Sequence, residues 1–275
     1  MVLKTRLTAL LGIQHPIVCG GMTGAGTVEL TAAVSEGGGC GMLTALTCGS
    51  PENLKRDIET VRSLTKKPFG VNLTILPSIT PPPYEEYART IVQSGVRIVE
   101  TAGNNPKKWI PLFKKAGLFC IHKCTSIRHA LSAQKLGVDV ISLDGFECSG
   151  HPGEDDVTNM ILAPIAARKL KIPFILSGGI GNGYGLAAAL AMGAEGVNMG
   201  TRFAVTKECP WPDAFKEACV KADERQTTLI FRTLKNTARV FKNKVAEEVA
   251  EIESRPGPTD FKDLQPLVSG ARGRE

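Results

Sequence analysis

The hydrophobic positions of this chain form short apolar runs that alternate with longer segments of helical spacing. Ile17 to Met22 is an apolar run broken by glycines, and Val28 to Glu36 follows it with apolar residues three and four positions apart. This order of buried strand, loop and helix repeats along the chain and predicts eight strands. The predicted strands are Ile17–Met22, Cys40–Ala45, Phe69–Thr74, Ile98–Thr101, Leu118–Cys124, Val140–Leu143, Phe174–Leu176 and Gly196–Met199.

Helix boundary signals agree with this pattern. Ser50 is a good N-cap residue before Pro51, and Gly95, Gly117 and Gly137 stand where helices should end. Besides a helix opened by Ser50, the predicted helices are Val28–Glu36, Tyr84–Gln93, Lys107–Lys115, Ser126–Leu136, Asp155–Leu170 and Tyr184–Met192.

Strands buried on both faces and separated by helices indicate a parallel sheet, and eight such units are the number that closes a barrel. The predicted fold class is therefore α/β, with a (β/α)8 TIM barrel over residues 1–205. The alternative is an open, doubly wound sheet. That fold normally carries a GxGxxG motif after its first strand, and no such motif opens this chain.

The alternation stops after Phe203. Residues 206–275 are predicted to be a helical segment and a tail, either part of the barrel domain or a small subdomain. We expect helices over Ala214–Ala222 and within Thr227–Glu253, and a loosely ordered tail from Ser254 that is rich in proline, glycine and charge. The apolar face of these helices would cover the barrel mouth, pack on its own protomer or form a homodimer.

Composition narrows the class of protein. The 275 residues are 43% hydrophobic and carry a formal charge of +6, much of it between Arg97 and Lys135. Without an aromatic or recognition motif, this charge indicates solvated outer helix faces rather than nucleic-acid binding. No run of about 18 apolar residues predicts a membrane span. Eight cysteines without a CxxC pair indicate buried thiols of a cytoplasmic protein, with no metal site.

The segment Asp144–Gly153, which we call the histidine loop, follows a predicted buried strand. Its glycines allow the backbone to approach a flat or phosphorylated ligand, and His151 can exchange protons near neutral pH. Asp144, Glu147 and Glu154 are the carboxylates within reach of this imidazole, and the sequence does not select one. The alternative is that His151 only caps or packs the loop.

In a barrel, residues just past each strand face one pocket. The glycine-rich turns after strands seven and eight are suited to phosphate, because their N–H groups are unobstructed. Asn72 can form hydrogen bonds with the polar edge of a heterocycle, and the positive charge of Lys123 can stabilise a ring that becomes anionic on reduction. We expect His15, His122, His129 and most cysteines to be structural, and Cys148 to lack an activating base. The expected cofactor-binding residues are Gly21, Met22, Thr23, Asn72, Lys123, Asp144, Ser149, Gly150, Ser177, Gly178, Gly179, Asn198, Met199, Gly200 and Thr201.

Four motifs resemble the nitronate monooxygenase family, formerly called 2-nitropropane dioxygenases. They are Gly70-Val71-Asn72-Leu73, Ile121-His122-Lys123-Cys124-Thr125, the loop Gly145-Phe146-Glu147-Cys148-Ser149-Gly150-His151-Pro152-Gly153, and Ser177-Gly178-Gly179-Ile180. The resemblance runs from about Leu7 to Phe203, with a weaker continuation at Val268 to Arg272. The loop is closer to the fungal type of the family than to the bacterial type.

This resemblance implies an FMN flavoprotein that oxidises nitronates or nitroalkanes with O2. It makes His151 the catalytic base and puts Met22, Asn72, Lys123, Gly150, Gly179, Gly200 and Thr201 around the flavin. Family members continue beyond the segment where this chain stops, so we expect a truncated or variant form with weaker FMN retention. The same loop also resembles flavin-dependent enoyl-acyl-carrier-protein reductases. A flavin- or phosphate-binding scaffold without activity is the third interpretation.

Overall fold

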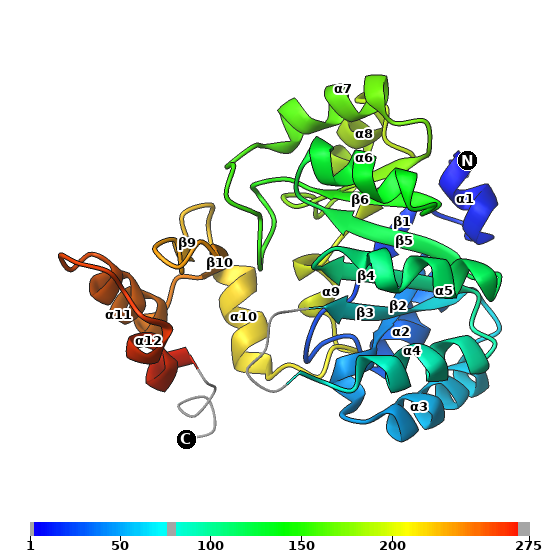
Figure 1. Cartoon of the computed structure of the whole chain (residues 1–275), viewed down its shortest axis with the longest axis horizontal. Coiled ribbons are helices and arrows are strands. Elements are labelled where there is room, and N and C mark those ends of the chain that lie inside the picture. The colour runs from blue at the N-terminus through cyan, green and yellow to red at the C-terminus, as the bar shows by residue number, and fades with distance from the viewer. Residues whose placement is uncertain (1–2, 76–80, 269–275) are drawn as a thin grey trace.

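Eight parallel strands close into a barrel in chain order in the computed structural model, which describes residues 3–75 and 81–268. Helices surround this barrel on its outer side (Figure 1). The predicted (β/α)8 fold is confirmed, and the open sheet is wrong. The strands are β1 (Ile17–Cys19), β2 (Cys40–Thr44), β3 (Phe69–Ile75), β4 (Ile98–Gly103), β5 (Phe119–Cys124), β6 (Val140–Asp144), β7 (Phe174–Ser177) and β8 (Val197–Asn198).

The predicted barrel helices are all present. Ser50 caps its helix as expected, accepting a hydrogen bond from the Asn53 N–H at 3.2 Å. The helix predicted from Asp155 instead begins at Asn159. The preceding residues Glu154 and Asp156 form hydrogen bonds with Thr237 and Arg232 of the C-terminal segment, so they are not part of the helix. The elements are α2 (Val28–Glu36), η1 (Ala45–Cys48), α3 (Pro51–Leu64), α4 (Tyr84–Gln93), η2 (Pro106–Lys108), α5 (Ile110–Lys115), α6 (Ile127–Lys135), α7 (Asn159–Lys169), α8 (Gly183–Ala191) and α9 (Thr201–Ala204).

The inside of the barrel is apolar at one end and polar at the other. Ile98, Ile121, Val140 and Ile175 belong to one buried cluster inside the barrel. Side chains two positions apart on a strand share a face, so the next inward residues are polar. These residues are Glu100, Lys123, Ser142 and Ser177. The inward polar side chains therefore lie toward the carboxyl ends of the strands, the end where the sequence analysis expects the site.

A short helix that the sequence analysis did not predict closes the apolar end. In α1 (Arg6–Leu11), Leu7 and Leu11 join the inner apolar cluster. Thr5 accepts a hydrogen bond from the Thr8 N–H, and Gly12 ends the helix at φ +70°. Six residues are too few to show a helical period, but the N-cap residue Thr5 and the C-cap residue Gly12 are signals that the sequence itself contains.

The C-terminal segment differs from the prediction. Thr227 to Phe241 forms an antiparallel hairpin, β9 (Thr227–Ile230) and β10 (Ala238–Phe241), so the expected helix there is wrong. β-branched residues in both strands favour this outcome. The hairpin packs with α11 (Lys244–Glu253) and α12 (Phe261–Val268) around a small separate core.

The helix α12 also corrects the expectation of a loosely ordered tail, since Leu264 is fully buried. α10 (Asp213–Lys221) lies between this unit and the barrel (Figure 1). The resemblance noted at residues 269–272 lies outside the described residues, and the boundary near residue 205 stays a prediction.

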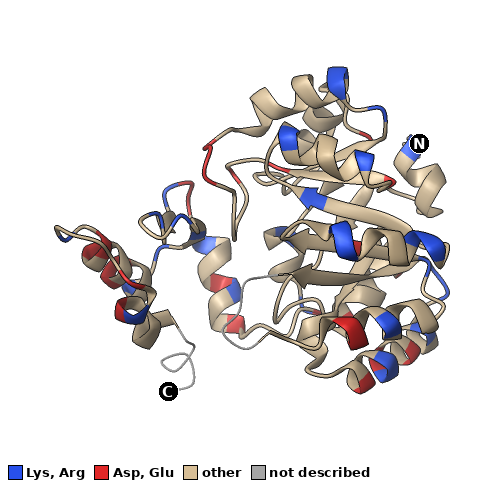
Figure 2. Cartoon of the chain, viewed as in Figure 1, with Lys and Arg blue, Asp and Glu red and all other residues tan. Residues whose placement is uncertain are grey.

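Positive charge is spread over the outer helices (Figure 2). The cations between Arg97 and Lys135 are exposed, as predicted, except Lys123, which points into the barrel. Within residues 3–75 and 81–268, no helix is long and apolar enough to cross a membrane.

Candidate functional site

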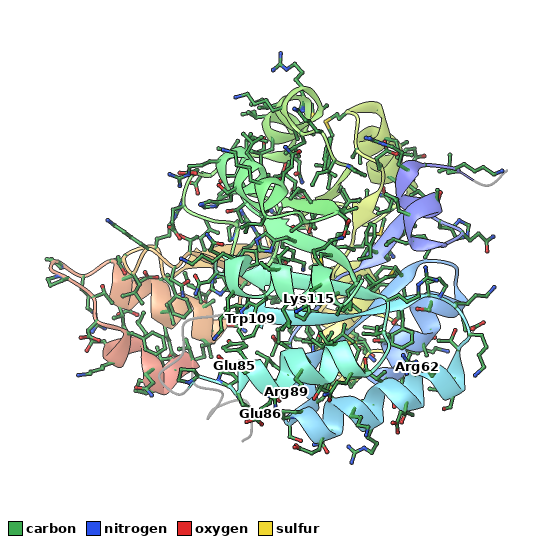
Figure 3. The ribbon with its side chains drawn as sticks, turned by 45° about the vertical axis from the view of Figure 1, so that its right-hand side comes forward. Arg62, Glu85, Glu86, Arg89, Trp109 and Lys115 are labelled. Atoms are coloured by element: carbon green, nitrogen blue, oxygen red, sulfur yellow. The ribbon has the colours of Figure 1, made fainter. Side chains whose placement is uncertain are left out.

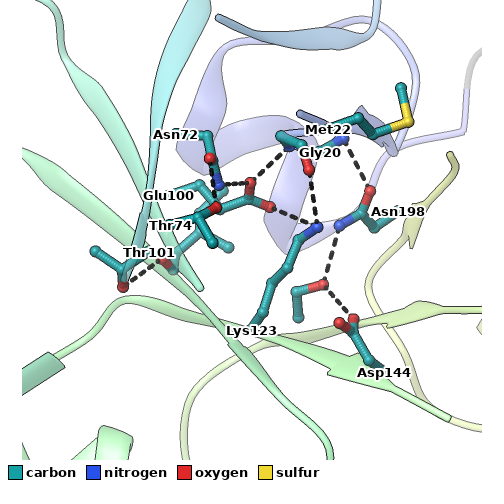
Figure 4. Close-up of polar contacts among 12 residues, drawn as sticks. Gly20, Met22, Asn72, Thr74, Glu100, Thr101, Lys123, Asp144 and Asn198 are labelled. Carbon is teal, nitrogen blue, oxygen red and sulfur yellow. Dashed lines mark hydrogen bonds and ion pairs between the residues drawn. The ribbon is translucent and has the colours of Figure 1, made fainter. Parts of the chain in front are cut away.

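A fully buried carboxylate, Glu100, organises the mouth of the barrel (Figure 4). Its Oε2 accepts hydrogen bonds from the Gly21 N–H at 2.7 Å and from Asn72 Nδ2 at 2.8 Å. The Asn72 Oδ1 in turn accepts from the Thr74 hydroxyl at 2.8 Å. Both polar ends of Asn72 are thus engaged by the protein, and its expected bond to a flavin edge stays a prediction. Glu100 joins the first strand's loop to strand β3.

Lys123 supplies the cation of the site. Its Nζ lies 3.8 Å from Glu100 Oε1 and 3.5 Å from the Gly21 carbonyl oxygen. Burial alone would lower the pKa of Lys123, but the Glu100 and Asp144 carboxylates outweigh burial and leave this pKa raised. The side chain is 18% exposed, so a fixed ammonium group reaches the mouth.

A second chain of polar contacts crosses the barrel. Asp144 accepts from the Ser142 hydroxyl at 3.3 Å, Ser142 accepts from Asn198 Nδ2 at 3.1 Å, and Asn198 accepts from the Gly20 N–H at 2.9 Å. Burial raises the pKa of Asp144, and Lys123 opposes this effect. The two chains of contacts fix the Gly20–Gly21 backbone from opposite sides.

The glycine turn after β7 presents backbone donors. Gly178 and Gly179 have φ of +99° and +69°, values that favour glycine. A Cβ on Gly178 would lie 2.6 Å from the Cys148 backbone nitrogen, so this turn packs closely on the histidine loop. The N–H groups of Gly179, Ile180 and Gly181 have no acceptor among the described residues. Such an arrangement suits an anion.

The histidine loop is fastened to the β9–β10 hairpin. Gly150 and Arg239 exchange two backbone hydrogen bonds of 3.0 and 2.7 Å. The exposed His151 ring places Nδ1 3.1 Å from the Thr237 carbonyl oxygen. The sequence analysis missed this contribution of the hairpin, because residues 86 positions apart share no local signal.

The other expected site residues lie at the same end of the barrel. Met22 lies by the turn after β8, since its sulfur is 3.4 Å from where a Cβ on Gly200 would stand. Met199 differs, because its side chain is buried in the outer hydrophobic core. The roles assigned to these residues stay predictions. Among these expected site residues, those that are exposed or half-buried are Gly21, Met22, Thr23, Asp144, Ser149, Gly150, Ser177, Gly178, Gly179, Gly200 and Thr201.

The eight cysteines are free thiols, six of them buried. Burial, followed by the nearby Asp144 carboxylate, raises the pKa of Cys148 to about 12. The thiolate needed for nucleophilic attack is therefore scarce at neutral pH. Cys148 packs the loop, in agreement with the expectation that it lacks activation.

His122 points to the opposite face of β5 from Lys123, as predicted, and is 4% exposed. Its Nδ1 lies 2.8 Å from the Thr101 hydroxyl oxygen. Burial lowers the pKa of His122 to about 4. Between pH 6.5, the ordinary pKa of imidazole, and about pH 4, this histidine is therefore protonated in the unfolded chain but remains neutral in the folded chain.

We expect this residue to remove roughly 3 kcal/mol of stability as the pH falls from 6.5 to 4. The variant His122→Asn keeps a polar partner for Thr101 but cannot gain a proton. Its free energy of unfolding, measured by urea titration, should fall less steeply over this pH range than that of the unchanged protein. Identical slopes would show that His122 is not the sensitive group.

A cavity of about 510 Å³ opens at the opposite end of the barrel. It lies beside α1 and the first residues of β3, β4 and β5, and touches none of the groups described above. Its cations include Arg62 (Figure 3) and Lys114, which lie in the last turns of α3 and α5. Cations there offset the negative helix ends.

The closed barrel carries a buried ion pair and two glycine turns at the carboxyl ends of its strands, the end at which (β/α)8 enzymes have their active sites. The sequence model of the nitronate monooxygenase family matches residues 4–265, and the chain belongs to this family. The predicted resemblance is thereby confirmed, although the closeness to the fungal type stays a prediction. Family and relatives together support a flavin-dependent oxidoreductase.

Two relatives differ in the chemistry that their names state. The chain is 35% identical over 227 residues to (3aS,4S,5R,7aS)-5-hydroxy-7a-methyl-1-oxo-octahydro-1H-indene-4-carboxyl-CoA dehydrogenase of Rhodococcus jostii, which covers 82% of this chain. The match spans only 62% of that protein's length. A probable nitronate monooxygenase of Staphylococcus aureus is 30% identical over 296 residues, covering 91% of this chain and 81% of that protein.

Among solved structures, FabK from Thermotoga maritima is similar over almost the whole chain. The TM-score is 0.89 at 36% sequence identity, with 99% of this chain and 84% of that chain covered. The similarity therefore extends over the C-terminal unit as well as the barrel.

Proposed function

We propose that this chain is an FMN-dependent oxidoreductase that converts alkyl nitronates and nitroalkanes with O2, with His151 abstracting the α-proton of nitroalkanes. The observation that carries the proposal is the Lys123 ammonium group, held by Glu100 at the same end of the barrel as the N–H donors of Gly179 to Gly181, which have no acceptor among the described residues. One end of this arrangement suits a ring that gains negative charge, and the other suits a phosphate.

The residues present fit FMN. Glu100 Oε1 is buried without a hydrogen-bond donor, so the site has unused polar capacity next to Lys123. A Cβ on Gly178 would lie 2.6 Å from the Cys148 nitrogen and one on Gly179 3.1 Å from Glu147 Cβ, so glycine lets this turn pack on the histidine loop and keep its N–H groups uncovered. Gly179 to Gly181, with Gly200 and Thr201, would hold the phosphate, and Lys123 would lie by the ring. When bound, FMN accepts electrons from the substrate and passes them to O2.

His151 would act on a nitroalkane as a general base. The Thr237 carbonyl can only accept a hydrogen bond, so Nδ1 carries the ring proton and Nε2 keeps its lone pair. Nε2 is then the atom that takes the α-proton, and the resulting imidazolium keeps its bond to Thr237. A nitronate has already lost this proton and does not need the step.

The FMN assignment predicts coloured protein after reconstitution. Incubation with FMN followed by removal of free flavin should leave flavin absorbance in the protein fraction. Gly179→Ala should weaken FMN binding by about tenfold or more, since a Cβ there would crowd Glu147 at 3.1 Å in the turn that faces the phosphate.

Gly117→Ala is the matched control for this variant. Gly117 also has positive φ, +76°, but lies in a turn between α5 and β5, with no atom within 4 Å of an added Cβ. It carries similar backbone strain and should leave FMN affinity unchanged. A protein that takes up no flavin, or equal losses in both variants, would contradict the assignment.

The Rhodococcus relative favours a second candidate, oxidoreduction of an acyl thioester, because its name states a carboxyl-CoA substrate. Anaerobic mixing separates the candidates. Reduction of bound flavin by a nitronate supports the first. Rapid bleaching by NADH or NADPH, with turnover of an enoyl thioester, supports the second. Bound flavin that none of these compounds reduces would indicate a binding scaffold.

A further inference from the structure

Three carboxylates, Asp144, Glu147 and Glu154, lie close enough in sequence to orient His151, and their contacts in the structure show which of them is connected to the ring. Asp144 faces Ser142 and Lys123 inside the barrel. Glu147 accepts two hydrogen bonds from the Asn159 N–H, both at 3.1 Å, at the start of α7. Neither carboxylate contacts the imidazole. Glu154 remains, and it reaches the ring through the hairpin.

Glu154 holds Thr237 on two sides. Its Oε1 accepts from the Thr237 N–H at 2.8 Å, and its Oε2 accepts from the Thr237 hydroxyl at 2.6 Å. Thr237 is 1% exposed and Glu154 is an exposed residue, so these bonds lie at the edge of the interior and are partly buried. Hydrogen bonds to a charged acceptor are stronger than neutral ones, and Thr237 is therefore fixed in place.

The next link is the Thr237 carbonyl, which lies 3.1 Å from His151 Nδ1. Since Glu154 and His151 belong to one short segment, the contacts form a closed ring from the segment to the hairpin and back. Arg239 strengthens the same junction, because its guanidinium donates to the Phe146 carbonyl at 3.1 Å and lies 4.7 Å from the Phe146 ring centre.

We infer that Glu154 is a positioning residue that acts through Thr237, fixing His151 in the tautomer with the proton on Nδ1. The ring then presents a basic Nε2 in one direction. The tautomer follows from the contacts alone, whereas its use in proton abstraction rests on the proposed function. A free imidazole exchanges between both tautomers, so the gain lies in having the reactive nitrogen ready before substrate binds.

The tautomer can be measured without any activity. Long-range proton–nitrogen NMR correlations on the full chain distinguish the two neutral forms, and the spectrum of His151→Asn identifies the His151 signals among four histidines. We expect the Nδ1–H form to dominate in the unchanged protein. Glu154→Ala should lower the ratio of Nδ1–H to Nε2–H by about fivefold, because a Thr237 carbonyl that is no longer fixed weakens the one hydrogen bond that selects the Nδ1–H form.

Asp155→Ala is the matched control. Asp155 is the next residue, is exposed, and has no hydrogen-bond or ion-pair partner among the described residues. It removes the same charge at almost the same place and should leave the tautomer ratio unchanged. A dominant Nε2–H form in the unchanged protein, or equal shifts in both alanine variants, would overturn the inference.

Kinetics supply the second readout. Glu154→Ala should lower kcat/KM for a neutral nitroalkane by about tenfold and leave turnover of the preformed nitronate and the FMN content close to normal. Glu154→Gln, which keeps one acceptor for Thr237, should recover part of the loss. Equal losses on both substrates would make Glu154 merely structural. If the unchanged protein turns over neither substrate, the proposed function fails while the NMR result still decides the positioning role.

Discussion

His151→Asn is expected to lower turnover of a neutral nitroalkane by about 10²–10⁴-fold, the usual cost of removing a general base. The Asn side chain places its Nδ2 near the position of the imidazole Nδ1 and can still donate to the Thr237 carbonyl, so the loop should keep its conformation. The measurement is the steady-state rate on one nitroalkane and on its preformed nitronate, compared at equal flavin content.

The preformed nitronate is the internal control, because it has lost the proton that a base would remove. Its turnover should change far less than that of the nitroalkane, and FMN content should stay normal. Equal losses on the two substrates with FMN still bound would mean that His151 positions the substrate rather than taking its proton.

The barrel could be predicted because its signals are local and repeated. Each strand is a short apolar run, and capping residues such as Ser50 and turn glycines such as Gly117 mark where helices begin and end. The period-two pattern also predicted correctly that His122 faces away from Lys123.

The hairpin could not be predicted in this way. Leu229, Ile230 and Leu234 occur at spacings that a helix would also allow, and its positive-φ residues Phe231 and Lys235 are not the usual glycine or asparagine. What decides the outcome is tertiary: Gly150 pairs with Arg239, and α11 packs on β9. Short apolar runs are ambiguous until such partners are known.

Glu100 is the clearest omission from the predicted site. The sequence analysis did not include it among the site residues. Its position inside the buried strand β4, next in the barrel to a strand that carries Lys123, was an available signal. Acids are almost never fully buried unless they are paired, so an acid in a buried strand indicates a cation on a neighbouring strand.

Lys123→Met is therefore expected to lower the free energy of unfolding by about 3–5 kcal/mol, because it leaves the fully buried Glu100 without its cation. Glu100→Gln should cost less, about 1–3 kcal/mol, since Gln can still accept from the Gly21 N–H and Lys123 keeps the Asp144 carboxylate nearby. The double variant should be more stable than Lys123→Met alone. Urea unfolding of the four flavin-free proteins at neutral pH measures this cycle.

The control is Lys115→Met, which makes the same substitution on the outer face of α5 (Figure 3). Lys115 is exposed and has no acidic partner among the described residues, so its loss should change stability by no more than about 0.5 kcal/mol. A coupling of about 1–3 kcal/mol between positions 100 and 123 is expected. Additive effects would show that the 3.8 Å contact carries no interaction of its own, and that each side chain acts only through its other neighbours.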